Sequence, residues 1–110
     1  MAHLKYSNLA YFSSRSYCGQ HMSELRVKSI HDSAYQVLVD CLRDARRKAR
    51  ITQVELAARL GTDQSYVSKY ERAERRLDVI ELRTLCRQFD ISLIDFVNSF
   101  EQELKRRGLT

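Results

Sequence analysis

The 110-residue chain has no proline and no tryptophan, and its only glycines are Gly19, Gly61 and Gly108. Proline and glycine most often interrupt helices and shape tight turns. Their scarcity argues against a sheet protein with many turns. The chain is instead rich in Ala, Leu, Glu, Arg, Gln and Lys, which favour helices. We expect an all-α fold.

Cysteine is also scarce, and Cys18, Cys41 and Cys86 form no C-x-x-C pair. An odd number of cysteines without such a pair excludes a disulfide framework and a zinc knuckle. Cys41 and Cys86 lie among apolar residues of expected helices, where cysteine acts as a small core residue. We interpret all three as reduced thiols.

The histidines are His3, His21 and His31, so none is present in the expected helical region. That region offers no general base for Cys41 or Cys86, and no glycine-rich phosphate loop. The sequence therefore does not favour an enzyme. We expect no metal, no cofactor and no small-molecule ligand.

No apolar run approaches the roughly 18 residues that cross a membrane, and the opening MAHLKYSNLAYFSSRSYCGQHM has no signal-peptide core. We therefore expect a cytoplasmic protein. Residues 1–30 are interpreted as a flexible, poorly ordered tail, within which Met22 is a candidate start. Residues 31–110 form the expected single domain.

Basic residues exceed acidic ones, with 19 Lys and Arg against 14 Asp and Glu, a net charge of +5 and a pI of about 9.3. Such an excess favours a polyanionic partner such as nucleic acid. An ordinary solvated basic surface would have the same composition. Charge alone does not decide between them.

Expected helix starts are marked by a capping residue followed three positions later by an acidic or amide residue. The pairs are Ser33 with Gln36, Thr52 with Glu55, Asp78 with Glu81, and Ser92 with Asp95. Asp63 is a fifth expected cap. With apolar residues at helical spacing, the caps predict helices over residues 34–48, 53–60, 64–72, 79–88 and 93–107.

The same spacing predicts the buried face of each helix. The expected core residues are Tyr35, Leu38, Leu42, Ala45 and Ala49 in the first helix, Val54, Leu56, Ala57 and Leu60 in the second, and Leu82, Leu85, Cys86 and Phe89 in the fourth.

Residues 52–71, TQVELAARLGTDQSYVSKYE, predict two short helices joined at Gly61. Small Ala57 lets the helices approach, and Gly61 permits a left-handed turn. Val67 and Tyr70 give the second helix an inward edge. This is the pattern of a helix-turn-helix, whose second helix can enter the major groove of DNA.

The outward face of that second helix carries side chains able to read base edges. Glutamine can pair with adenine, serine can bond several base-edge groups, and lysine can reach guanine or a phosphate. A solvated face of an ordinary helical hairpin is the alternative. The candidate base-reading residues are Gln64, Ser65, Tyr66, Ser68 and Lys69.

Several motifs resemble the lambda-repressor-like, or Cro/XRE-type, helix-turn-helix regulators. They are L-R-x-x-R at 42–46, I-T-Q-V-E-L-A at 51–57, L-G-T-D-Q-S-Y-V-S-K-Y-E at 60–71 and E-R-R at 74–76. The resemblance covers about residues 35–97. It implies a compact five-helix DNA-binding domain.

The resemblance also implies residue roles. Gln53 would bond a phosphate and brace Gln64, while Arg46 and Glu71 would form a structural ion pair. The residues expected to contact phosphate are Gln53, Arg72, Arg75 and Arg76. Ala73 departs from the family, which usually has glycine there. Because alanine disfavours positive φ, we expect the helix to continue a residue or two.

The expected function is that of a transcriptional repressor, a homodimer on a palindromic operator in double-stranded DNA. The expected dimer contacts are Leu93, Val97, Phe100 and Leu104. Residues 22–30 folded over them are an alternative. A second functional hypothesis is an antitoxin that binds a partner toxin and its own promoter, because a flexible flank can fold onto a partner.

Overall fold

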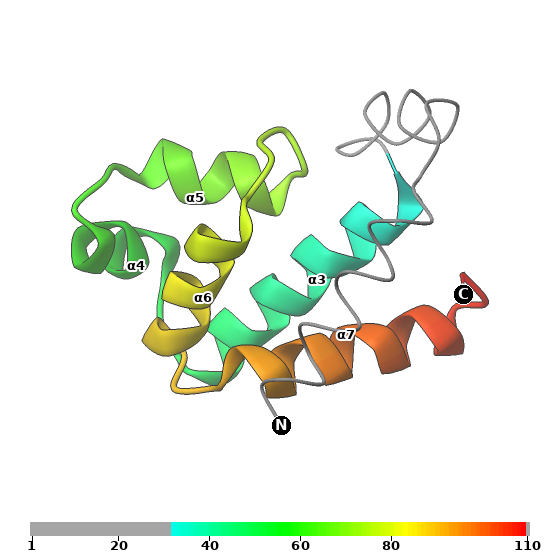
Figure 1. The fold of residues 1–110 in the computed structure, drawn as a ribbon. Coiled ribbons are helices and arrows are strands. Elements are labelled where there is room, and N and C mark those ends of the chain that lie inside the picture. Colours follow the sequence, from blue (N-terminus) through cyan, green and yellow to red (C-terminus); the bar gives the residue numbers. More distant parts are fainter. Residues whose placement is uncertain (1–31, 110) are drawn as a thin grey trace, which may run out of the picture.

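The structure, a computed structural model, describes residues 32–109. These residues form five α-helices and no strand (Figure 1). The helices are α3 (Ser33–Lys48), α4 (Gln53–Leu60), α5 (Gln64–Glu71), α6 (Val79–Gln88) and α7 (Leu93–Arg106). The predicted all-α fold is confirmed, and every helix boundary lies within one residue of its expected position. The interpretation of residues 1–30 as a tail and of Met22 as a start lies outside the described residues.

Helix α3 connects the two ends of the domain. It contacts α5 at one end and runs beside α7 (Figure 1). Helices α4 and α5 contact each other, and α6 contacts α7. Helix α3 therefore packs against the second helix of the helix-turn-helix pair.

Two of the predicted capping pairs form complete reciprocal caps, Thr52 with Glu55 and Asp78 with Glu81. In each, the cap side chain accepts from the backbone N–H three residues on, and the glutamate accepts from the cap N–H. The Ser92 hydroxyl likewise accepts from the Asp95 N–H. The starts of α4, α6 and α7 were thus readable from local sequence.

The cap of α3 was wrongly predicted. It is Asp32, whose carboxylate accepts from the Ala34 N–H at 2.7 Å, and Ser33 is already helical. Aspartate caps as well as serine does, so the earlier residue starts the helix. Asp63 occupies the cap position of α5, but its carboxylate accepts from the Ser65 hydroxyl at 2.7 Å instead of from the helix backbone.

The core is formed by inward residues of all five helices. The predicted residues of α6 and Phe89 after it are all buried, as are Leu42, Leu56 and Ala57. Leu38, Ala45 and Ala49 are half-buried against this core. Tyr35 is also half-buried, and Val37 and Val39 are buried.

Val54 was wrongly predicted to be buried, since it is 60% exposed. At about 100° per residue, Val54 lies about 120° around α4 from Leu60 and about 160° from Leu56. The short helix can turn only one side to the core, and Val54 is on the other.

Left-handed residues end the helices, although the chain has few glycines to place there. Gly61 and Gly108 have φ of 70° and 73°, while Arg50, Ala73 and Asp90 adopt φ near 60° without being glycine. The expectation that α5 continues through Ala73 was therefore wrong. The Ala73 N–H donates to the Tyr70 carbonyl and the Glu74 N–H to the Lys69 carbonyl, and these bonds close the helix.

We predict that Ala73→Gly raises the free energy of unfolding by about 1 kcal/mol, because glycine adopts positive φ without a Cβ clash. Chemical denaturation measures the change. Ala58→Gly is the matched control, since exposed Ala58 is inside α4 and glycine there should cost about 1 kcal/mol. Equal destabilisation by both substitutions would contradict the left-handed conformation of Ala73.

Candidate nucleic-acid interface

Helices α4 and α5 form a helix-turn-helix with a fixed inner edge and an exposed outer face. Val67 and Tyr70 are fully buried, as predicted. Thr62 and Gly61 donate backbone N–H groups to the Ala57 and Ala58 carbonyls, which ends α4 at the turn. Because Val67 and Tyr70 face the core, the opposite side of α5 faces solvent.

Arg46 and Glu71 form the expected ion pair beneath this unit, and both are almost completely buried. Arg46 Nε donates to Glu71 Oε2 at 2.7 Å, and Nη2 donates to Oε1 at 3.1 Å. Arg46 Nη1 also donates to the Ile51 carbonyl at 2.8 Å. One guanidinium thus joins the ends of α3 and α5 to the segment before α4.

The Glu71 carboxylate continues into the exposed face through two glutamines. Gln53 Nε2 donates to Glu71 Oε1 at 2.9 Å, and Gln64 Nε2 donates to Gln53 Oε1 at 3.2 Å. A carboxylate only accepts, so Gln53 must turn its NH₂ group inward and its carbonyl toward Gln64. Gln64 keeps its own carbonyl and one N–H for a ligand.

Arg75, expected to contact phosphate, is held against the protein. Its Nη2 donates to Glu81 Oε2 at 2.8 Å, and its guanidinium lies 4.7 Å from the Tyr66 ring centroid. The Tyr66 hydroxyl donates to the same Glu81 oxygen at 2.9 Å. Burial is the main cause, and the hydrogen bond to Glu81 the second, of the rise in the pKa of Tyr66 to about 12. Tyr66 and Arg75 therefore stabilise the loop after α5.

Tyr35 fixes the same loop from α3. Its hydroxyl donates to the Arg75 carbonyl at 2.7 Å and accepts from the Leu77 N–H at 3.0 Å. Sequence reasoning missed Glu81 and Tyr35 as loop residues. Their partners lie 6 and 42 positions away along the chain, and no local pattern marks the longer contact.

The comparisons with known proteins agree with this geometry. Residues 42–96 match the helix-turn-helix family. A solved structure, an XRE-family like protein from Pseudomonas syringae pv. tomato str. DC3000, is 50% identical, with a TM-score of 0.62 over 71% of this chain and 95% of that chain. The chain belongs to the XRE-type helix-turn-helix family. No curated protein is similar enough to count as a match.

Members of the XRE-type family are DNA-binding regulators, and the chain is accordingly a DNA-binding regulator. Its outer α5 face carries Gln64, Ser65 and Lys69 exposed and Ser68 half-buried. Arg72 follows on this face, and its guanidinium bonds Ser68 and Glu74. Arg76 is exposed and, within residues 32–109, takes part in no ion pair.

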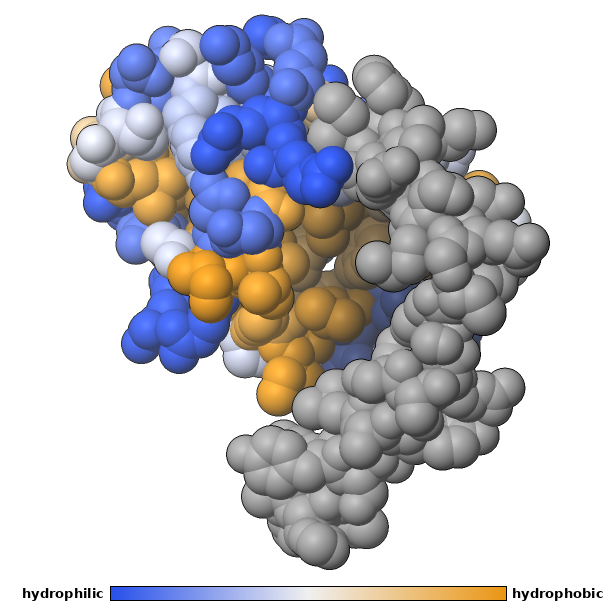
Figure 2. Space-filling view, turned by 45° about the horizontal axis from the view of Figure 1, so that its top comes forward, coloured by the Kyte–Doolittle hydropathy of each residue, from blue (hydrophilic) through white to orange (hydrophobic). Residues whose placement is uncertain are grey.

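Helix α7 carries the residues expected to meet a second copy. Leu104 is buried, and Leu93 and Phe100 pack against the core, so these three contribute first to the fold. Val97 is 38% exposed and its neighbour Ile94 is 74% exposed. Apolar side chains gather in the middle of one face in Figure 2.

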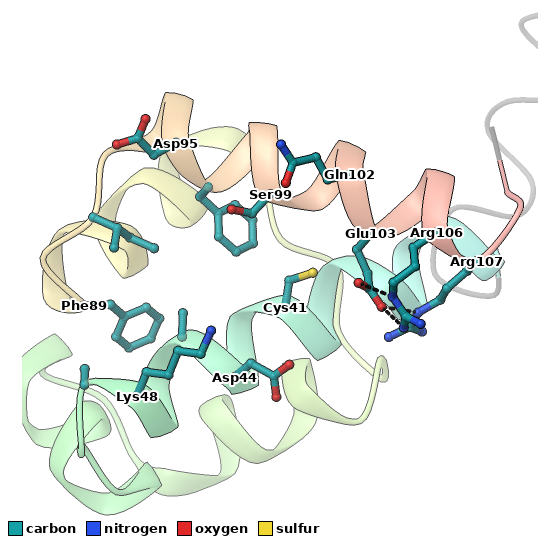
Figure 3. A pocket seen from close by; sticks show the side chains of 14 residues that line it. Cys41, Asp44, Lys48, Phe89, Asp95, Ser99, Gln102, Glu103, Arg106 and Arg107 are labelled. Atoms are coloured by element: carbon teal, nitrogen blue, oxygen red, sulfur yellow. Dashed lines mark hydrogen bonds and ion pairs between the residues drawn. The ribbon is translucent and has the colours of Figure 1, made fainter.

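A groove of about 810 Å³ lies between α3 and α7. Asp44 and Lys48 line one side, while Ser99 and Gln102 line the other (Figure 3). At one end Glu103 accepts from Arg106 and Arg107, and these bonds lower its pKa to about 2. The groove has mixed charge.

Residues 32–109 contain no group of three or more His, Cys, Asp or Glu placed to hold a metal ion. Among the helices of that region, none combines the length and apolar character needed to cross a membrane.

We predict that Glu71→Ala destabilises the protein by about 3 to 5 kcal/mol, because the Arg46 charge is left buried without its partner. Loss of DNA binding in this variant would then follow from misfolding. Thermal and urea unfolding measure the change. Glu103→Ala removes a more exposed partner of two arginines and should have a far smaller effect. A Glu71→Ala protein with wild-type stability would contradict the structural role.

Proposed function

We propose that the protein is a sequence-specific transcriptional repressor that binds a palindromic operator as a homodimer, with α5 in the major groove. The observation that carries the proposal is the hydrogen-bonded series from buried Glu71 through Gln53 to Gln64. An exposed glutamine of a merely solvated face needs no support from a buried anion. A base-reading glutamine benefits from it, because less side-chain freedom is lost on binding.

The orientation of Gln64 matches adenine. Its available carbonyl can accept from adenine N6, and its remaining N–H can donate to N7, which is the bidentate pair by which glutamine reads adenine. Ser65 is exposed on the next position of the helix. We assign Gln64 and Ser65 as the leading base-reading residues, with Ser68 and Lys69 beside them.

Phosphate contacts fit the start of α4 and the loop after α5. Helix α4 begins at Gln53, and a helix N-terminus favours an anion. Arg76 is exposed in the loop. Arg75 is bound to Glu81, so we expect it to contribute through loop structure and not through a direct phosphate contact.

Selection from a random duplex library at about 150 mM salt tests the proposal, because non-specific phosphate binding is weak there. We predict a two-fold symmetric site in which Gln64→Ala and Ser65→Ala each relax one position by about 1 to 3 kcal/mol. Gln102→Ala and Ser99→Ala make the same changes on exposed α7 positions and should leave the site unchanged. Enrichment of no site would refute sequence-specific binding.

Repression is tested separately from binding. The selected site is placed over the promoter of a reporter gene, and expression is compared with and without the protein. Lower expression that recovers with Gln64→Ala supports a repressor, whereas higher expression would identify an activator.

The homodimer is proposed to form through the exposed part of α7. Val97 and Ile94 are exposed apolar residues near the start of α7. We predict that the double substitution Val97→Glu with Ile94→Glu raises the dimer dissociation constant by about tenfold or more, because a charge would have to be buried in the interface. Analytical ultracentrifugation measures this. Val54→Glu, at an exposed valine of α4, is the control. An unchanged dimer would place the interface elsewhere.

A further inference from the structure

A second hydrogen-bonded series, which we name the Glu74 relay, lies on the outer face of α5. Arg72 Nε and Nη2 donate to the two oxygens of Glu74, each at 3.0 Å. Arg72 Nη1 donates to the Ser68 hydroxyl at 2.6 Å. All three guanidinium nitrogens of Arg72 thus donate a hydrogen bond, and the series ends at a candidate base-reading serine.

The backbone places Glu74 where it can hold Arg72. At about 100° per residue, a continued helix would carry residue 74 about 200° around the axis from residue 72. Left-handed Ala73, with φ of 60°, turns the chain back instead. The Glu74 N–H then donates to the Lys69 carbonyl at 2.8 Å and anchors the residue beside the end of α5.

The chemical types in the relay fix its direction. A carboxylate only accepts hydrogen bonds and a guanidinium only donates them, whereas a hydroxyl can do either. Because Arg72 donates to Ser68, the Ser68 hydroxyl must accept at that side and direct its own hydrogen elsewhere. The hydrogen bonds from Arg72 also lower the pKa of Glu74, so the acceptor at the start of the relay stays ionised.

We propose that Arg72 and Glu74 are specificity-determining positioning residues that present Ser68 to DNA as a hydrogen-bond donor. Ser68 then selects an acceptor at the base edge it meets, such as guanine O6 or N7 or thymine O4. Because Arg72 already occupies one of the two lone pairs of the Ser68 oxygen, the hydroxyl accepts less readily from the amino groups of adenine and cytosine. The inference rests on the proposed function, and it gives Arg72 a role other than the expected phosphate contact.

The two roles of Arg72 predict different behaviour of its conservative variant. Lysine keeps the positive charge, so a phosphate contact would survive Arg72→Lys. Lysine lacks the planar fork that binds both Glu74 oxygens while reaching Ser68, so the relay would not survive. The base preference at the Ser68 position, and not overall affinity, is therefore the informative measurement.

The experiment is the same duplex selection with wild type, Ser68→Ala, Arg72→Lys and Glu74→Ala, and a titration of Arg72→Ala with DNA at several salt concentrations. Ser68→Ala identifies the base pair that Ser68 reads, where the wild type should prefer an acceptor by about two- to tenfold, the size of one neutral hydrogen bond. Arg72→Lys and Glu74→Ala should lose this preference and keep the one set by Gln64. Glu101→Ala removes a carboxylate from an exposed α7 position and should keep both.

The outcomes separate the two proposals. If the wild type enriches no site, the proposed function fails, and the inference fails with it. If a Gln64-dependent site appears but Ser68→Ala changes no base pair, or Arg72→Lys and Glu74→Ala keep the Ser68 preference, the relay is wrong. If Arg72→Ala weakens all sequences equally and reduces the salt slope by about 1, Arg72 is a phosphate contact. Thermal unfolding of each variant verifies its fold.

Discussion

The buried pair of Arg46 and Glu71 is the interaction on which both the fold and the candidate interface depend. Its guanidinium bonds the end of α5 and the Ile51 carbonyl before α4, so it sets how the two helices meet α3. Its carboxylate also bonds Gln53, which bonds Gln64. The atoms that hold the fold together are therefore also bonded, through Gln53, to the glutamine that we propose reads DNA, and a change of either charge alters both at once.

The outer face of α5 is held in two physically different ways. Gln64 is bonded to Gln53, which is anchored to a carboxylate that is 3% exposed. The bond from Gln53 to that carboxylate is partly buried, so water competes less for it. Ser68 is oriented by Arg72 and Glu74, whose side chains are more than half exposed, where water and salt compete. The first support is anchored in the core, whereas the second can be altered by surface substitutions that leave the core intact. Under the proposed function, such a regulator can change part of its sequence preference without losing its fold.

Local sequence predicted the elements because caps and helical spacing act over three or four residues, as Thr52 with Glu55 and Asp78 with Glu81 demonstrate. The prediction that Val54 is buried was wrong because an eight-residue helix has few apolar positions from which to define a face. The prediction that α5 continues through Ala73 was wrong because the preference of alanine against positive φ, about 1 kcal/mol, is outweighed by the hydrogen bonds that close the helix. The resemblance identified Arg46 and Glu71. Helical spacing predicted Tyr35 only as a core residue, and no sequence pattern predicted its hydrogen bond to Leu77, 42 positions away.

The positive charge of the chain is a poor guide to where DNA lies, because several arginines near α5 are paired with carboxylates of the protein. Arg46 pairs with Glu71, Arg72 with Glu74 and Arg75 with Glu81. Three arginines that composition would assign to a basic surface are thus matched by carboxylates at or beside α5. What remains distinctive there is a set of amide and hydroxyl groups whose donors and acceptors are oriented by those same pairs. Under the proposed function, paired charge around α5 therefore contributes less to general attraction to phosphate than to the geometry in which bases are met, which is where sequence specificity originates.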